Sequence, residues 1–310
     1  MEEKGKLIPE REDVLWEYCE TVNQYVMGRL KKKSYVVRWI CVGIMTALAL
    51  SALSCDPNFK SLEQRQKWER LILVKLRKDI SEEKKQEILN LFMALNKSRK
   101  NGKPYLKAEY GFQNSKEGLN AGYEIAFRIS FSSIEDRDYF DGKSLQTPDS
   151  LNPAYDNFKN FISLYLDGDQ GLFNFDFISN EKISLNVQAK EYKIEHLVFF
   201  KFRKDITSSE KQMIIDRFLA LKNSVKNGKP YIRFIEYGFE NNKNAQDSDF
   251  EVVFRVGFLS LEDRDYYVGK PFLNDTGTFD PMHDDFKNFV GSYLDPAGGV
   301  LVFDYEAIRP

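Results

Sequence analysis

The sequence predicts an α+β protein made of two tandem βαββαβ units, and three observations support this prediction. The pentapeptide EDRDY occurs at Glu135–Tyr139 and again at Glu262–Tyr266. The segments NGKPY and EYGF and a Pro-containing segment that ends in FKNF also occur twice, each 126 to 128 residues apart. Both copies contain the same order of strand-like and helix-like patterns. A repeat of this length is a whole domain, since the units of solenoid proteins are far shorter.

The repeat divides the chain, whose 310 residues agree with about two domains. The predicted ranges are 1–55 for an extension with a signal or anchor segment, 56–68 for a linker, 69–177 for the first copy, 178–194 for a second linker, 195–305 for the second copy and 306–310 for a tail.

Each copy begins with an apolar strand, RLILVKL or HLVFFKF, followed by an amphipathic helix. Ser81 and Thr207 are the expected N-caps of the two helices. Apolar residues then recur at i, i+4 and i+7, which predicts a stripe that faces the core. These residues are Ile88, Phe92 and Leu95 in the first copy and Ile214, Phe218 and Leu221 in the second. We expect NGKP to end each helix, with Gly102 or Gly228 as a left-handed cap.

The remaining elements complete the unit. YEIAFRISF and FEVVFRVGF alternate between two faces, as a strand does. EDRDY follows Ser133 or Ser260, which predicts a short helix whose acidic residues lie in the first turn. Asn152 and Asp280 precede prolines and are the expected starts of a further helix. A last strand gives the order of the ferredoxin-like fold, with its second helix interrupted by a loop.

The face of each sheet that points away from the helices must also be covered, because it carries large apolar residues. Examples are Leu197, Phe199 and Val253. The simplest cover is the sheet of the other copy, which predicts one intramolecular α/β barrel in a monomer. We expect Arg128 to pair with Glu124 on this face, and Arg255 to pair with Glu251.

Composition and residue counts exclude several classes of function. With 42% hydrophobic and 30% charged residues and a net charge of −2, the chain has the composition of a globular protein. It lacks the basic, aromatic-rich surface pattern of a nucleic-acid-binding protein. The cysteines are Cys19, Cys41 and Cys55, and the histidines are His196 and His283. This set excludes a His/Cys zinc site in the repeat, and we expect no metal and no cofactor there.

The segment Met27–Cys55 has the pattern of an export signal. Basic residues precede the uncharged run Trp39–Leu53, and small residues lead to Cys55. The segment resembles a bacterial lipoprotein signal peptide, in which this cysteine is lipidated. It predicts an envelope lipoprotein that is anchored in a membrane outside the cytoplasm, with Met27 as a candidate start. The alternative is an uncleaved single-pass anchor, because the uncharged run through Cys55 has 17 residues.

Both copies resemble the stress-responsive A/B barrel (Dabb) domain of the dimeric α/β barrel superfamily. The segments that carry the resemblance are EHLVFFKF, EYGFE, FEVVFRVGF, LEDRDYY, DPMHDDF and VFDYEA. Members of the family range from plant stress proteins to olivetolic acid cyclase, a polyketide cyclase, and related barrels include small monooxygenases. The resemblance implies the same fold for both copies.

The resemblance also implies site residues in the second copy. The catalytic histidine and tyrosine of the cyclase correspond to His283 and Tyr267, and a pocket histidine corresponds to His196. The first copy has Tyr155 and Phe140 in place of His283 and Tyr267. The implied ligand-binding residues are His196, Val198, Val252, Phe254 and Phe286.

Two functional hypotheses follow. The first is a lipid-anchored envelope protein that binds a small hydrophobic molecule or a partner without catalysis. The alternative is a small-molecule enzyme of cyclase, isomerase or monooxygenase type that works without a cofactor and uses His283 and Tyr267. The chain has no glycine-rich phosphate loop and no nucleophile elbow, which are the sequence signs of other enzyme classes.

Overall fold

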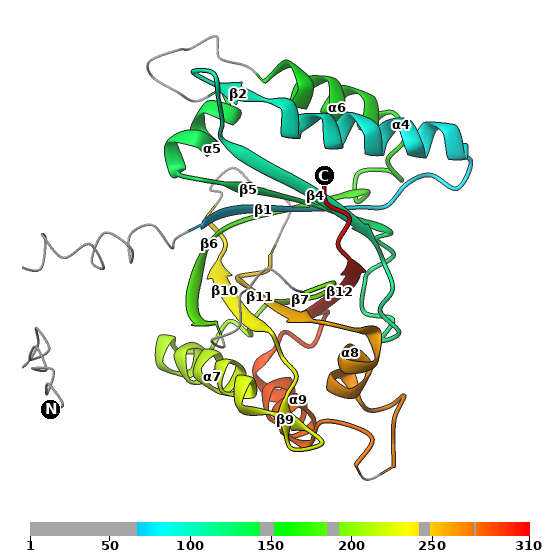
Figure 1. Cartoon of the computed structure of the whole chain (residues 1–310). Helices are drawn as coiled ribbons and strands as arrows, with labels where there is room; N and C mark the ends of the chain where they lie inside the picture. Colours follow the sequence, from blue (N-terminus) through cyan, green and yellow to red (C-terminus); the bar gives the residue numbers. More distant parts are fainter. Residues whose placement is uncertain (1–66, 143–151, 185–191, 242–248, 276) are drawn as a thin grey trace, which may run out of the picture. The chain divides into compact units, whose positions relative to one another are not determined.

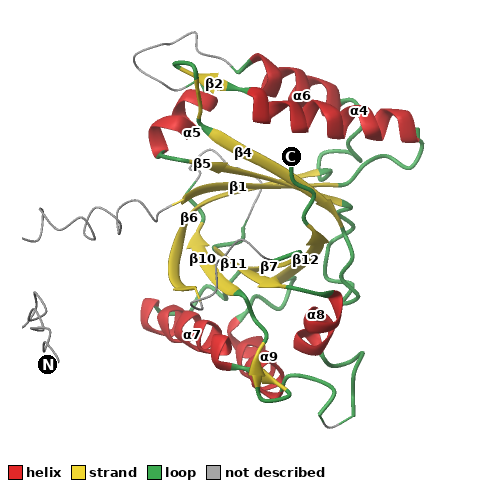
Figure 2. Ribbon diagram, in the orientation of Figure 1, coloured by secondary structure: helices red, strands yellow, loops and turns green. Residues whose placement is uncertain are grey.

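The structure is a computed structural model that describes residues 67–142, 152–184, 192–241, 249–275 and 277–310. The described residues belong to one compact unit. The long strands of the two copies form two halves that face each other, and helices cover the outer sides of these halves (Figure 1, Figure 2). Cys55 and the apolar run before it lie outside the described residues. Within the described ranges, no helix is both long and apolar enough to cross a membrane.

The first copy has the predicted order of elements, and its second helix is interrupted as expected. The elements are β1 (Lys67–Val74), α4 (Glu82–Met93), the 3-10 turn η2 (Ala94–Lys97), β2 (Arg99–Lys100), β3 (Lys103–Pro104), β4 (Leu106–Phe112), β5 (Ile125–Phe131), α5 (Ile134–Phe140), α6 (Pro153–Ser163) and β6 (Leu172–Ser184).

The second copy repeats this order. Its elements are β7 (Ile194–Phe200), α7 (Ser208–Ala220), η3 (Leu221–Asn223), β8 (Val225–Lys226), β9 (Lys229–Pro230), β10 (Phe234–Phe239), β11 (Val252–Phe258), α8 (Leu261–Val268), α9 (Pro281–Val290), η4 (Gly291–Tyr293) and β12 (Val300–Glu306).

The predicted helix starts are confirmed. At each one, the side-chain oxygen of the N-cap residue accepts a hydrogen bond from a backbone N–H of the first turn, which satisfies a donor that the helix itself leaves unpaired. These N-caps are Ser81, Ser133, Asn152, Thr207, Ser260 and Asp280. Thr207 also forms a complete capping box with Glu210.

The expectation that NGKP caps the long helices is wrong. Helix α4 ends at Met93 and passes into a 3-10 turn before this segment is reached. Asn101 and Gly102, with φ of 51° and 75°, instead form the two-residue turn between β2 and β3. Asn227 and Gly228 form the same turn between β8 and β9. Two successive residues with positive φ are what a type I′ hairpin turn requires, and Asn-Gly is its preferred pair.

The eight long strands form one continuous sheet in the order β12-β7-β11-β10-β6-β1-β5-β4. Strand β6 joins the copies, because its first part pairs with β1 and its last part pairs with β10. At the other edge, bridges join Tyr110 to Ile308 and Gln113 to Tyr305, so that β4 meets β12. Each copy therefore contacts the other at both edges, and the predicted intramolecular barrel is confirmed.

Three apolar clusters stabilise this arrangement. One lies between the helices and the sheet of the first copy, one lies in the same place in the second copy, and the third fills the space between the two sheets. The predicted helix stripes belong to the first two clusters. Leu197, Phe199 and Val253 are fully buried in the third, as expected.

The charged residues inside the barrel pair differently from the prediction. Arg128 donates to Glu109 at 2.8 Å and to Glu69 at 3.0 Å, rather than to Glu124. The reason is the strand register, which puts Arg128 directly opposite Glu109, and directly opposed residues are the closest cross-strand neighbours.

The second copy shows the same correction. Arg255 lies opposite Glu236 and pairs with it and with Glu195. Glu251 pairs with Lys211 instead. A cavity of about 750 Å³ opens beside the Arg128 network. It is lined by Lys67, Pro104, Leu106, Lys107, Ala108, Glu109, Arg128, Ser130, Phe131, Ser132, Tyr192, Arg309 and Pro310.

Candidate active site

The site in the second copy begins with a histidine and an aspartate on neighbouring strands. The register of β7 and β12 puts His196 opposite Asp304, and both side chains are buried. The Nδ1 atom of His196 lies 2.6 Å from Oδ1 of Asp304. Because an ionised carboxylate only accepts hydrogen bonds, Nδ1 carries a proton that it donates to Asp304, and Nε2 is the ring nitrogen that this bond does not use.

Arg264 on α8 holds the same aspartate from the other side. Its guanidinium donates to Oδ2 of Asp304 and is itself buried. Burial alone would raise the pKa of Asp304, but His196 and Arg264 together lower it below its usual value. Asp304 therefore stays ionised, and it fixes the orientation of the His196 imidazole.

Tyr267 and His283 form the second half of the site. Tyr267 lies on α8, and His283 lies in the first turn of α9, where Asp280 caps the helix. Their rings stack with centroids 3.8 Å apart and planes inclined by 16°. His283 Nδ1 lies 2.5 Å from the backbone oxygen of Tyr267. A carbonyl oxygen can only accept, so Nδ1 of His283 is protonated and Nε2 is unprotonated.

Burial determines the charge states of this stacked pair. Desolvation, followed by the positive charge of Lys287, lowers the pKa of His283 well below 6.5, so the imidazole is neutral at pH 7. Desolvation raises the pKa of Tyr267 well above its usual value, so the phenol keeps its proton. The site thus contains a neutral imidazole and a neutral hydroxyl donor.

Tyr267 lies between the two histidines. Its ring centroid is 5.3 Å from that of His196, with the planes inclined by 74°. The side chain of Tyr267 is completely buried, and its hydroxyl group has no hydrogen-bond partner among the described residues. Buried polar groups are usually paired, and an unpaired one at a cluster of imidazoles marks a candidate ligand position.

The sequence-based site residues fall into two groups in the structure. His196, Tyr267 and His283 come together from three different elements. The apolar candidates all belong to the core cluster that also contains Tyr267, and neither of the two cavities described in the structure is lined by them. They are Val198, Val252, Phe254 and Phe286.

Three residues in or beside this site were not identified from the sequence. They are Asp304, Arg264 and Glu117, whose carboxyl group lies within 4.8 Å of ligand atoms of His196 and Asp304. Asp304 and Arg264 belong to repeated segments, FDF/FDY and EDRDY, so the repeat contained a signal for both. The clearest part of this signal was the aspartate that both copies have on the last strand, Asp176 and Asp304. Glu117 comes from the first copy, and no local pattern connects it to the site of the second.

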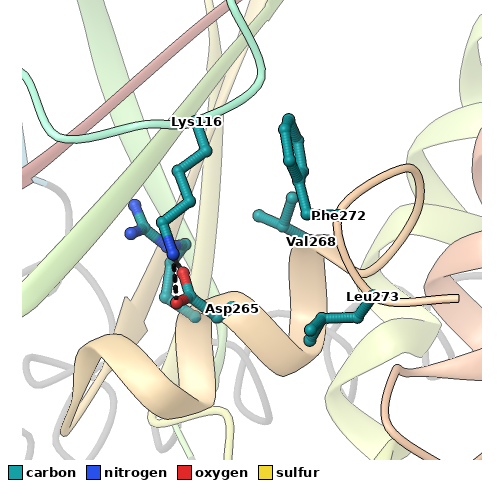
Figure 3. Close-up of a pocket in the computed structure, with 6 residues that line it drawn as sticks. Lys116, Asp265, Val268, Phe272 and Leu273 are labelled. Atoms are coloured by element: carbon teal, nitrogen blue, oxygen red, sulfur yellow. Dashed lines mark hydrogen bonds and ion pairs between the residues drawn. The ribbon is translucent and has the colours of Figure 1, made fainter. Parts of the chain in front are cut away.

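A small cavity lies next to the cluster. Its volume is about 80 Å³. Its walls come from Lys116 in the loop between β4 and β5 of the first copy, from α8, and from Phe272 and Leu273 after α8. Figure 3 shows Lys116 reaching Asp265 on α8, with Val268, Phe272 and Leu273 beside them. Arg264, which holds Asp304, also lines this cavity. Of the residues in the buried cluster, Arg264 borders this cavity, whereas His196, Tyr267 and His283 do not line it.

Glu117, His196 and Asp304 also meet the spacing of a metal site, with one possible ligand atom from each within 4.8 Å of the others. Both oxygens of Asp304 are already used, one by His196 and one by Arg264. A divalent cation there would also face the buried guanidinium of Arg264. The donor set fits a hydrogen-bonded acid–base cluster better than a cation site.

The chain is similar to several proteins of known structure. An anthrone oxidase-like protein of known structure has a TM-score of 0.49 at 10% identity, with 80% of this chain and 93% of that chain covered. Chlorite dismutase from Candidatus Nitrospira defluvii has a TM-score of 0.42 at 8% identity, with coverages of 80% and 95%. An Arabidopsis thaliana protein has a TM-score of 0.30 at 18% identity, with coverages of 38% and 97%.

A search of curated protein sequences gave no match. The family model of the stress responsive A/B barrel domain matches the chain twice, over residues 69–177 and 194–307. These two segments include nearly all of the described strands and helices. The chain therefore belongs to the stress-responsive A/B barrel domain family and contains two tandem copies of the domain.

Proposed function

We propose that the protein is a small-molecule enzyme that transfers a proton and that its active site lies in the second copy. The observation that carries this proposal is the buried hydroxyl of Tyr267, which has no partner within the described ranges and belongs to a ring that contacts two imidazoles. An unpaired buried hydroxyl costs about 1–3 kcal/mol. A bound molecule that accepts its hydrogen bond would remove this cost.

In the proposed reaction, His196 is the base. Its Nε2 takes a proton from a carbon next to a carbonyl group, the C–H bond breaks, and the electron pair moves towards the carbonyl oxygen. Asp304 stabilises the resulting imidazolium, as the carboxylate does in Ser-His-Asp sites. Tyr267 donates a hydrogen bond to the negative oxygen as it forms.

His283 has a different part in this reaction from the one implied by the sequence. The resemblance made it the catalytic base, but its pKa is lowered by burial and it has no carboxylate partner to stabilise a positive charge. We assign the base to His196 for this reason. His283 instead holds the Tyr267 ring by stacking and offers Nε2 as a neutral acceptor.

The surroundings favour a small, uncharged and mainly apolar substrate. Val198, Phe254 and Phe286 belong to the same apolar core cluster as Tyr267. A charged substrate would lose its hydration in this buried region, which is costly. An aryl ketone combines an apolar ring, a carbonyl oxygen and an acidic C–H bond, so it fits each of these requirements.

The test is exchange of the α-protons of aryl ketones with D₂O, beginning with acetophenone and followed by ¹H NMR. We expect the protein to accelerate the exchange. His196→Gln and Tyr267→Phe should each slow it by about 100-fold or more. Tyr155→Phe, which removes a tyrosine hydroxyl from the first copy at the position equivalent to His283, is the control and should exchange at the wild-type rate. No acceleration by the wild type, or equal rates for all variants, would contradict the proposed function.

We also propose that Cys55 anchors the protein to a membrane outside the cytoplasm, on the basis of the signal-like segment before it. Mass spectrometry of the membrane-extracted protein should show an acylated Cys55 as the first residue. A mature chain that still begins before Cys55 would contradict the lipoprotein hypothesis and favour an uncleaved anchor.

A further inference from the structure

We propose that Glu117 of the first copy acts as an acid in the active site of the second copy, so that the catalytic centre needs both halves of the chain. This inference rests on the proposed proton transfer and adds a catalytic residue to it. Four features of the structure support it: the anchoring of a loop, the position of Glu117, the pairing of two carboxyl groups and the difference between the two copies.

The loop between β4 and β5 is attached to the site of the other copy (Figure 1). The backbone N–H of Asn114 donates to the carbonyl oxygen of Asp304 at 2.8 Å. The backbone N–H of Val302 donates to the carbonyl oxygen of Leu119 at 3.0 Å. Arg264 donates to the side-chain oxygen of Asn114 at 2.9 Å. The loop is thus bonded to the strand that carries Asp304 and to the arginine that holds it.

Lys116 fixes the loop at the outer side of the site. It pairs with Asp265 on α8 at 2.9 Å (Figure 3). Since Asn114, Lys116 and Leu119 all contact the second copy, the intervening Glu117 is held over the same region. Backbone and side-chain bonds therefore restrict where its carboxyl group can lie.

Glu117 is directed towards the acid–base cluster. One of its oxygens lies within 4.8 Å of atoms of His196 and of Asp304. Its Oε2 atom is buried and has no hydrogen-bond partner in the described part of the chain. The carboxyl group thus has an unused hydrogen-bonding position beside the imidazole that we assign as the base.

The pKa values of the two carboxyl groups, those of Glu117 and Asp304, are shifted in opposite directions. Burial raises the pKa of Glu117, whereas His196 and Arg264 hold the pKa of Asp304 below its usual value. Pairs of neighbouring acids with separated pKa values are typical of sites in which one group donates a proton and the other accepts hydrogen bonds. Glu117 is therefore the donor and Asp304 the acceptor.

In the completed reaction, Glu117 protonates the oxygen that Tyr267 holds. As His196 takes the proton from carbon, the O–H bond of Glu117 breaks and a new O–H bond forms on the substrate, which becomes a neutral enol. Glu117 is left as a carboxylate and regains a proton from the His196 imidazolium. Each proton that leaves one group is accepted by another, and no oxidant or reductant is required.

The loop of the second copy lacks this acid. It crosses to the first copy in the same way, because the backbone N–H of Asn241 donates to the carbonyl oxygen of Asp176 at 2.9 Å. The spacing of the repeat puts Asn244 at the position equivalent to Glu117, and this residue lies outside the described ranges. In the sequence, this position of the repeat therefore has a carboxyl group in the loop that crosses to the copy with the two histidines, and an amide in the other loop.

The test compares Glu117→Gln with Glu124→Gln, an exposed glutamate at the end of the same loop. Glu117→Gln should slow the exchange of acetophenone protons by about 100-fold, because a general acid typically contributes at least that much. Its infrared spectrum at pH 7 should lose one band of a protonated carboxylic acid. Glu124→Gln should keep the wild-type rate and the wild-type spectrum.

The spectrum and the rate separate the two proposals. If the wild type does not accelerate exchange, the proposed function fails, and loss of the infrared band in Glu117→Gln then still supports a protonated Glu117 in the cluster. An unchanged infrared spectrum in Glu117→Gln overturns the inference. So does a wild-type exchange rate in Glu117→Gln while His196→Gln is inactive.

Discussion

The two copies place different chemistry at equivalent positions of the same fold. In the first copy, Arg70 stands where the second has His196. Its guanidinium donates twice to Asp176, both times at 2.7 Å, and twice to Asp141, at 2.7 and 2.9 Å. The guanidinium of Arg70 is therefore held by two carboxylates, one on each side.

The pair of rings beside this position also differs between the two copies. The first copy packs Phe140 against Tyr155 with centroids 4.2 Å apart and planes inclined by 38°, where the second stacks Tyr267 on His283. Phe140 has no hydroxyl group, and Arg70 lies over its ring at 5.8 Å. The first copy thus fills the position with a salt bridge and an apolar ring.

This difference separates a structural core from a candidate site. The two carboxylates accept four hydrogen bonds from the guanidinium of Arg70, so most of its donors are already used. The second copy keeps the Nε2 atoms of two imidazoles outside these hydrogen bonds, and the Tyr267 hydroxyl has no partner among the described residues. The first copy has a salt bridge at this position. The second copy has unpaired polar groups of the kind that functional sites use.

The largest predicted effect is on the stability of the first copy. Arg70→Met leaves the buried Asp176 without its guanidinium partner and should lower the free energy of unfolding by about 3–5 kcal/mol. In the second copy, His196→Gln should cost only about 1.5 kcal/mol, because Arg264 still pairs with Asp304. Urea unfolding of the two variants measures both values.

An exposed pair provides the control. Arg77 pairs with Asp79 at the surface, so Arg77→Met should leave stability almost unchanged. If Arg70→Met costs no more than His196→Gln, the salt bridge does not stabilise the first copy in the way that we describe.

The fold was predictable because local and repeated signals agreed. Caps such as Thr207 and Asp280, the helix stripes and the strand alternation all appear twice in the sequence. The Asn101-Gly102 turn was misassigned because an Asn-Gly pair is compatible with both a helix end and a hairpin, and only the backbone angles separate these possibilities. The partners of Arg128 required the strand register, which alternation alone does not determine.

The candidate site was predictable only in part. The resemblance brought together His196, Tyr267 and His283, which the structure places in one cluster. Asp304 was visible as part of a repeat but carried no sign that it would contact a histidine. Glu117 depends on how the two sheets close on each other, and this long-range arrangement leaves no local pattern in a single sequence.

The smallest predicted effect concerns pH. The folded protein holds the pKa of His283 well below 6.5, mainly through burial and then through Lys287 and His196. Below about pH 6.5 the unfolded chain therefore binds a proton at this residue that the folded chain does not bind. Stability should fall as the pH decreases through this range, by at most about 1.4 kcal/mol per pH unit. The contribution is fully present above pH 6.5.

His283→Tyr tests this effect by giving the second copy the residue of the first. Tyrosine is neutral throughout the range from pH 5 to pH 7, so the variant should lose less stability than the wild type as the pH falls. Urea unfolding at pH 5, 6 and 7 measures the two slopes, and Tyr155→Phe in the first copy should have the slope of the wild type. Equal slopes for His283→Tyr and the wild type would mean that His283 takes up a proton in the folded protein as readily as in the unfolded chain. A protonated imidazole stacked on Tyr267 would rule out the neutral acceptor that the second copy contributes to the proposed site.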